Sequence, residues 1–343
     1  MKKTIIAVAL TSLITGAAQA ATVYKADNGD NVKVYGGAEV GGTFVSDTDK
    51  SPFEKDKVNK STFVDDSFAT IGLKGQTGDF YAKFELDGER QDWTRDNNMR
   101  IVIDKAYVGY NVTKGHSIEF GRTDTAYDHV DAFGDVTNEL GLGISEAGDQ
   151  DSTIKYRGKF GSVKVGISHS LEGWDGTTKA DGHPEKYSYE TDSLYGQVTN
   201  GYIGYYGETF TVIAGAEEGD ETSIYSLHGE VELGKITLAG LVFDETKNFD
   251  KGSDTNEVGV NLGGKYAMTE KLNLLANVNY SDSDAFAEEA YYGVVGAEYR
   301  YASNVKLAAE VAFGDVLKGA KDANKKKTTE SGALAYLMAY YWF

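Results

Sequence analysis

The chain of 343 residues contains no cysteine, which excludes disulfide scaffolds, zinc–thiolate sites, iron–sulfur clusters and thiol nucleophiles. It has two prolines against 41 glycines, whereas loop-rich soluble domains carry several per cent proline. Basic residues are also scarce, since 34 Lys and Arg face 53 Asp and Glu and leave a net charge of −19. No nucleic-acid partner is therefore expected, because such binding depends on clustered positive charge. No internal run reaches the roughly 18 apolar residues of a membrane-spanning helix.

The N-terminal segment has the three parts of a secretory signal peptide. Lys2-Lys3 gives a positive start, residues 4–14 are mainly apolar, and Ala18-Gln19-Ala20 places small residues before a cleavage point. A short membrane anchor is the alternative, but the apolar segment is too short for one. We therefore expect residues 1–20 to be removed on export, which leaves residues 21–343 as the mature chain.

Alternation of apolar and polar residues dominates the rest of the sequence. In the segment 81–87 (YAKFELD) the two kinds of side chain alternate strictly, which predicts a strand with one apolar and one polar face. The pattern recurs along the chain and predicts sixteen strands, at residues 32–46, 62–77, 79–91, 100–113, 117–123, 152–160, 162–171, 191–206, 209–217, 222–233, 235–245, 255–267, 271–282, 290–301, 304–316 and 331–343.

The predicted connections alternate between brief turns and longer acidic loops. The longer loops are centred near residues 53, 95, 137, 181, 219, 250, 286 and 323. Short turns at one end and long loops at the other are typical of outer-membrane barrels. In a bilayer every backbone polar group must be paired, so the sheet has to close, and a barrel of about sixteen strands encloses an aqueous channel. The sequence predicts an all-β fold in one domain over residues 21–343: a 16-stranded antiparallel transmembrane β-barrel with short periplasmic turns and long extracellular loops.

Three segments resemble the general trimeric porins of Gram-negative outer membranes. They are residues 21–44 (ATVYKADNGDNVKVYGGAEVGGTF), residues 106–122 (AYVGYNVTKGHSIEFGR) and the final Tyr341-Trp342-Phe343. The resemblance implies a multi-pass homotrimer in the outer membrane that lets ions and small hydrophilic solutes diffuse passively. It also implies contact with lipid and lipopolysaccharide, and an assembly signal at Tyr341 and Phe343 that the barrel-insertion machinery recognises.

The resemblance further implies that the third loop folds into the barrel and narrows it. The corresponding connection, from Thr123 to Asp151, is interpreted as the longest in the chain; it contains eight acidic residues and no lysine or arginine. Asp135 and Glu139 align with the acids that line the constriction of the family's channels. We group them with two further acids of the same loop as pore-constriction residues, Asp128 and Asp131. A solvated external loop is the alternative, but the apolar residues between the acids favour packing against a wall.

The family faces these acids with a ladder of basic residues on the barrel wall. The aligned positions here hold no basic residue: Gly37, Thr70 and Asp104. Three nearby basic residues remain candidates to replace the ladder: Lys83, Lys105 and Arg100. Three acids have the parity of lumen-facing positions: Glu39, Glu85 and Asp87. The predicted pore wall therefore comprises Glu39, Thr70, Lys83, Glu85, Arg100 and Asp104.

An acidic channel of this kind is expected to prefer cations, because rings of acidic side chains are a common device for cation selectivity. One carboxylate about 4 Å from an ion is worth about 1 kcal/mol even in bulk water. The Debye length of about 8 Å at physiological salt leaves charges in a narrow pore poorly screened. Two or three unpaired acids would thus favour cations by about an order of magnitude.

Three other functions compete with the diffusion channel. A substrate-specific channel would need a ladder of lumen aromatics, and a barrel enzyme would need a cluster of serine, histidine and acid at one rim. Ser168 and His169 are adjacent on a strand, so their side chains point to opposite faces and cannot form a catalytic pair. An adhesin with a plugged lumen is the third alternative. The five histidines lack metal-ligand spacing, and we expect no cofactor, no metal and no enzymatic activity.

Overall fold

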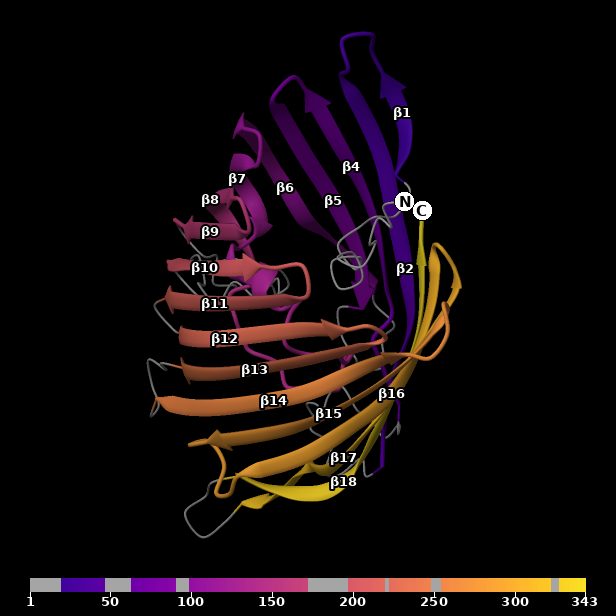
Figure 1. The fold of residues 1–343 in the computed structure, drawn as a ribbon, viewed down its shortest axis with the longest axis vertical. Coiled ribbons are helices and arrows are strands. Elements are labelled where there is room, and N and C mark those ends of the chain that lie inside the picture. The colour runs from indigo at the N-terminus through magenta and orange to yellow at the C-terminus, as the bar shows by residue number, and fades with distance from the viewer. Residues whose placement is uncertain are drawn as a thin grey trace, which may run out of the picture.

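In the computed structural model, the described residues are 20–46, 63–90, 99–171, 197–219, 222–247, 254–321 and 327–343. They form one antiparallel sheet whose strands follow the chain order around a ring (Figure 1). The strands are β1 (Ala21–Lys25), β2 (Asn31–Val45), β3 (Phe63–Asp65), β4 (Phe68–Thr77), β5 (Phe80–Arg90), β6 (Met99–Thr113), β7 (His116–Asp124), β8 (Asp149–Phe160), β9 (Val163–Ser170), β10 (Val198–Tyr206), β11 (Phe210–Gly219), β12 (Thr222–Leu233), β13 (Ile236–Lys247), β14 (Thr255–Ala267), β15 (Leu272–Ser283), β16 (Ala290–Ala302), β17 (Val305–Lys321) and β18 (Lys327–Trp342).

Two of these eighteen strands are parts of longer ones, so the described chain forms a closed barrel of sixteen. β3 and β4 both pair with β2 and are separated by Asp66 and Ser67. β1 pairs with the start of β2, on the edge that β18 occupies farther along. β1 therefore continues the line of β18. The barrel closes where Trp342 pairs with Gly37.

The sixteen predicted strands are confirmed, with shifts at their ends, and β1 is a strand that the prediction missed. One expectation about the connections was wrong. The expected long loop near 219 lies between β11 and β12, which are separated by two residues. Most of the chain between β9 and β10 lies outside the described residues. The predicted signal peptide lies outside the described residues, apart from Ala20.

The two faces of the sheet differ as the alternation predicts. Large apolar side chains are exposed on the outer face, among them Ile71, Leu73, Phe84, Val108 and Phe120. On the inner face, several tyrosines lie flat across a glycine of the neighbouring strand. A Cβ added to Gly72 would lie 2.3 Å from the Tyr35 ring, and one added to Gly109 would lie 2.2 Å from the Tyr81 ring. Close contacts of this kind explain why glycines occur inside strands.

The connections that follow the even-numbered strands from β4 to β16 are short and lie together at one end of the barrel, which we call the turn end. The other end is the loop end, where the connection between β11 and β12 is also short. Gly115 and Gly234 have positive φ values of 86° and 69° in two of these turns, a conformation that favours glycine. Within the described parts of the chain, no helix is long and apolar enough to cross a membrane.

Candidate functional site: the third loop and the channel wall

The third loop, residues 125–148, lies inside the barrel against the wall. It begins with a short 3-10 helix, η2 (Tyr127–Val130), whose Tyr127 and Val130 are buried. The Ala126 N–H donates to Ser168 Oγ on β9 at 2.8 Å, and the Tyr127 N–H donates to Asn200 Oδ1 on β10 at 3.2 Å. Farther along, the Tyr292 hydroxyl on β16 donates to the Gly141 carbonyl at 2.9 Å. The loop therefore crosses the lumen face of most of one half of the barrel.

Buried glutamates of the wall hold the backbone of this loop. Glu217 on β11 accepts a hydrogen bond from the Ala147 N–H at 3.0 Å, and Glu245 on β13 accepts one from the Ser145 N–H at 3.3 Å. Both glutamates are at most 3% exposed. A carboxylate that accepts backbone N–H bonds is a strong anchor, because its charge strengthens each bond. These acids therefore position the loop.

Glu310 on β17 makes the largest set of such bonds, at the far end of the loop. Its Oε2 accepts the N–H groups of Glu139 and Leu140 at 3.1 and 3.0 Å. Its Oε1 accepts the Asn138 N–H and, at 2.8 Å, the Asn138 side-chain amide. Three successive N–H groups that converge on one carboxylate form an anion-binding concavity. Lys306 donates to Asn138 Oδ1 at 2.9 Å and completes the anchor.

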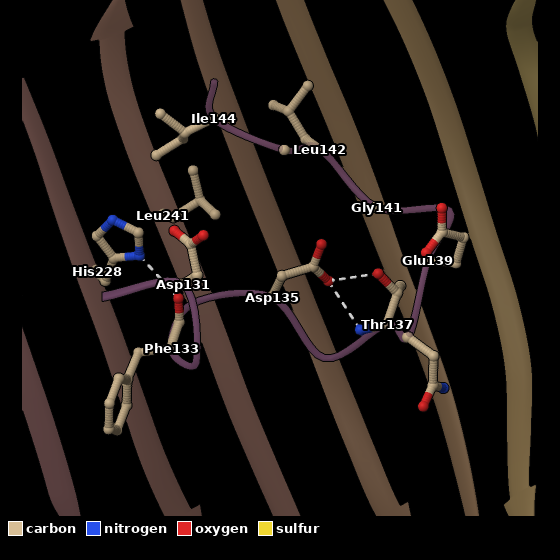
Figure 2. Close-up of a pocket in the computed structure, with 12 residues that line it drawn as sticks. Asp131, Phe133, Asp135, Thr137, Glu139, Gly141, Leu142, Ile144, His228 and Leu241 are labelled. Atoms are coloured by element: carbon tan, nitrogen blue, oxygen red, sulfur yellow. Dashed lines mark hydrogen bonds between the residues drawn. The ribbon is translucent and has the colours of Figure 1, made fainter. Parts of the chain in front are cut away.

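Asp135, predicted as a constriction acid, lies inside the curve of the loop. Its Oδ1 accepts the N–H and the hydroxyl of Thr137, both at 2.8 Å, and the Asn277 amide of β15 at 3.0 Å. The carboxylate points between two parts of the loop, the one with Asp131 and Phe133 and the one with Leu142 and Ile144 (Figure 2). It lies beside a cavity of about 380 Å³. These bonds shape the turn and leave the carboxylate half-buried.

The other predicted loop acids differ in exposure. Asp131 and Glu139 are exposed to the interior of the barrel, and Asp128 is half-buried. Burial inside the barrel and the charge of Asp128 raise the pKa of Asp131 to about 7. Burial and the charges of Asp66 and Glu310 raise the pKa of Glu139 to about 7. Burial also raises the pKa of Asp128 to about 7. These acids thus change charge near neutral pH.

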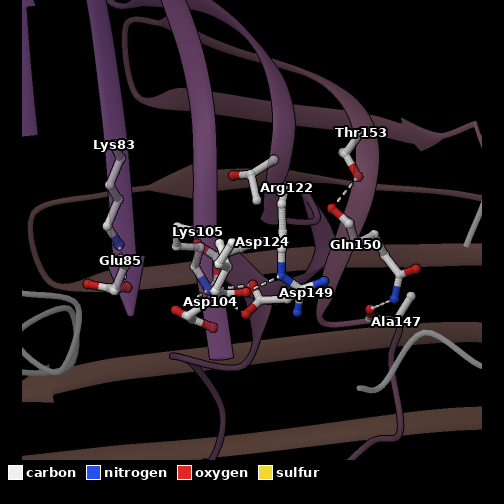
Figure 3. Close-up of polar contacts among 12 residues, drawn as sticks. Lys83, Glu85, Asp104, Lys105, Arg122, Asp124, Ala147, Asp149, Gln150 and Thr153 are labelled. Atoms are coloured by element: carbon white, nitrogen blue, oxygen red, sulfur yellow. Dashed lines mark hydrogen bonds and ion pairs between the residues drawn. The ribbon is translucent and has the colours of Figure 1, made fainter. Parts of the chain in front are cut away.

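Lys105, a candidate for the basic ladder, is surrounded by carboxylates (Figure 3). Its ammonium lies 3.0 Å from Asp104 Oδ2 and 2.6 Å from Asp124 Oδ1, and it also contacts Asp149. The pairing of β5 with β6 shifts by one residue here, so that Asp104 and Lys105 both face inward. Asp124 and Asp149 are the last residue of β7 and the first of β8. Lys105 therefore joins the two ends of the third loop.

The remaining predicted wall residues lie on adjacent strands. Glu39 and Thr70 face the lumen on β2 and β4, with Thr70 opposite Gly37, and Glu39 forms no ion pair among the described residues. Lys83 on β5 donates to Glu85 at 2.9 Å. Arg100 pairs with Glu89 in the backbone register of β5 and β6, and its side chain lies outside the described residues.

A row of lysines crosses this part of the wall, nearer the turn end than the ladder positions. Lys33 is directly opposite Lys74, and Lys74 is directly opposite Lys83. The row is four residues along β2 from Gly37 and four along β4 from Thr70. The prediction named only Lys83 of this row. Lys33 has the lumen parity of Tyr35 on β2, and Lys74 has that of Thr70 on β4, a signal in the sequence that identifies them.

A serine–histidine pair occurs under the third loop but lacks the features of a catalytic pair. His228 Nε2 lies 2.9 Å from Ser226 Oγ, and His228 Nδ1 bonds to the Phe133 carbonyl at 2.7 Å in place of an acid. His228 is 1% exposed. Ser168 and His169 point to opposite faces, as predicted: Ser168 is 2% exposed and His169 bonds to Thr199 on the exposed face.

The sequence analysis missed the three wall glutamates that bind the loop. Glu310 is an acid at a lumen-facing position between Ala308 and Ala312, both small and buried. An isolated acid with that parity indicates a partner across the lumen, because a buried carboxylate needs hydrogen bonds. Glu217 and Glu245 also have lumen parity, but each is adjacent to another acid in the sequence, Glu218 and Asp244 respectively.

Comparison with known proteins assigns the family. The sequence profile of the Gram-negative porins matches residues 6–318. The chain is similar to OmpF of Salmonella typhi, with a TM-score of 0.68 and 14% identity over 94% of this chain and 100% of that chain. It is also similar to OmpT of Vibrio cholerae, with a TM-score of 0.66 and 15% identity over 94% of this chain and 100% of that chain. A third similar structure is the anion-selective porin from Comamonas acidovorans, with a TM-score of 0.64 and 15% identity over 92% of this chain and 100% of that chain. The chain therefore belongs to the Gram-negative porin family and is an outer-membrane channel.

Proposed function

We propose that the protein is a passive diffusion channel for ions and small hydrophilic solutes that prefers cations, with its constriction at the third loop. The observation that carries this proposal is the exposure of Asp131 and Glu139 to the lumen, on a loop held against the wall. Neither acid forms an ion pair with a lysine or arginine in the described part of the chain. The constriction acids are thus Asp131 and Glu139, with Asp128 beside them and Asp135 shaping the loop.

The residues of the lumen, rather than the fold, set the sign of the preference, since an anion-selective porin shares this fold. On the wall, Glu39 adds a carboxylate that forms no ion pair among the described residues, whereas Glu85 is paired with Lys83 and Asp104 with Lys105. One unpaired carboxylate contributes about 1 kcal/mol at 4 Å in water. Two such acids favour cations by about an order of magnitude.

The same proposal covers assembly and location. Residues 1–20 act as a cleaved signal peptide, and the mature chain forms a homotrimer, as OmpT of Vibrio cholerae does in its trimer form. Lipid and lipopolysaccharide surround the apolar outer face. Tyr341 and Phe343 serve as the assembly signal for the insertion machinery; both side chains are exposed on the barrel. The protein has no enzymatic activity.

Planar-bilayer recording tests the proposal directly. The purified protein is reconstituted and its conductance steps and reversal potential are measured in a KCl gradient. We expect conductance in groups of three steps and a reversal potential on the cation side. Anion preference would overturn the role given to Asp131 and Glu139, and the absence of conductance from folded protein would overturn the open channel.

Cation preference is expected to fall as the pH falls from about 8 to about 5. The pKa values of Asp131 and Glu139 are raised to about 7, so both carboxylates are charged above this pH and neutral below it. The reversal potential measured at steps of pH should move toward zero with a midpoint near 7. The matched control is Asp131→Asn with Glu139→Gln, in which most of this movement should be lost. A double variant that titrates like the native channel would assign the effect to other groups.

A further inference from the structure

The lysine row, defined as Lys33, Lys74 and Lys83, is a concentration of positive charge in a strongly acidic protein. The three residues are directly opposite one another on β2, β4 and β5. Neighbouring strands are about 4.8 Å apart, so the row spans about 10 Å across the wall. Like charges placed directly opposite each other in an antiparallel sheet are destabilising. The three lysines therefore destabilise the barrel, which indicates that they serve a purpose other than stability.

Most of this charge has no carboxylate partner. Lys83 is paired with Glu85, but neither Lys33 nor Lys74 forms an ion pair in the portion of the chain that the structure describes. Other wall lysines differ in this respect: Lys155 lies 3.0 Å from Glu119 and Lys265 lies 3.1 Å from Glu298. The lysine row thus keeps a net positive charge, while those lysines neutralise nearby acids.

The Tyr35 ring supports two of the ammonium groups. Lys74 Nζ lies 4.4 Å and Lys83 Nζ 5.5 Å from the ring centroid. Tyr35 is 5% exposed and lies flat on Gly72, where even a methyl group would overlap its ring. A fixed ring that attracts both cations holds them together against their mutual repulsion. The lysines are therefore organised before any ligand arrives.

We propose that the lysine row is a binding site, at the turn end of the lumen, for anions that carry two or more phosphate groups. Lysine binds phosphate as a point charge and offers three donors and no acceptor. Linked phosphates place several negative charges along a length of the same order as the row, whereas a single chloride meets only one or two lysines. The inference rests on the proposed function only in that the lumen must admit the solute.

Calorimetric titration of the detergent-solubilised full chain tests the site, with inorganic tripolyphosphate as the probe at low salt. We expect saturable binding of one tripolyphosphate per chain, weakened at least tenfold by Lys33→Gln with Lys74→Gln. The charge-matched control is Lys114→Gln with Lys271→Gln, two exposed turn-end lysines outside the row, which should bind as the native protein does.

Two results would overturn the site: no saturable binding by the native protein, or equal weakening in the row and control variants. A circular dichroism spectrum and a limited-proteolysis pattern unchanged from the native protein confirm that the row variant is folded. Because binding is measured without a membrane, its failure is separate from a failure of the cation preference in bilayer recordings. Both can hold together, since the row and the loop acids lie at different heights in the lumen.

Discussion

Replacing Glu310 by glutamine is expected to raise the single-channel conductance and the current noise. The native carboxylate accepts the N–H groups of Asn138, Glu139 and Leu140. Glutamine keeps one acceptor oxygen, and its NH₂ group would face backbone donors. Hydrogen bonds to a charged group contribute about 1.5–3 kcal/mol each. A loss of about 3 kcal/mol raises the population of the detached loop about a hundredfold.

Bilayer recording together with limited proteolysis measures this effect. The released loop should become a cleavage site, while the barrel itself stays resistant. Glu257→Gln is the matched control, because Glu257 faces the same wall on β14 and bonds to Ser281 instead of the loop. Native conductance and native protease resistance in Glu310→Gln would show that the remaining contacts hold the loop by themselves.

Replacing Lys105 by glutamine is expected to produce the largest loss of stability among the wall residues. The ammonium contacts Asp104, Asp124 and Asp149 and is 7% exposed. Its removal leaves three carboxylates close together, and breaking a buried ion pair from one side costs about 3–5 kcal/mol. The unfolding midpoint in denaturant should fall accordingly, and the fall should be greatest at neutral pH, where the carboxylates are charged.

The conservative variant Lys105→Arg separates charge from packing. It retains the positive charge, so it should keep more stability than Lys105→Gln. Lys114→Gln, at an exposed turn, controls for the loss of one lysine and should unfold as the native protein does. If Lys105→Gln also unfolded at the native midpoint, the cluster would contribute nothing to the barrel.

The sequence predicts the barrel well because alternation is a local property. A strand such as β14 shows its period within a few residues, and its observed bounds, Thr255–Ala267, coincide with the predicted ones. β1 was missed because its five residues are all exposed and show no alternation of burial. The short connection between β11 and β12 was missed because the acidic residues at the end of β11 have the composition that is typical of a loop.

The site was less predictable than the fold because partners across the lumen are far apart in sequence. Asp135 and Glu139 look equivalent in the sequence, yet Asp135 bonds to Thr137 and Asn277 while Glu139 faces the lumen. A register shift of one residue at Asp104 turns Lys105 toward three acids, and the sequence pattern contains no sign of it. The displaced lysine row follows from the pairing register, which parity alone does not fix.

The pairing of Gly37 with Trp342 determines how the chain must assemble. When β3 and β4 are counted as one strand, every pairing in the described ring except that of β2 with β18 joins strands adjacent in sequence, so hairpins can form one after another with little loop-closure entropy. Joining β2 to β18 brings together nearly the whole length of the chain, and contacts of such high sequence separation form slowly. Until that step, β2 and β18 are unpaired edges that invite association with other chains. The folding rate and the tendency to aggregate are thus both governed by a single seam.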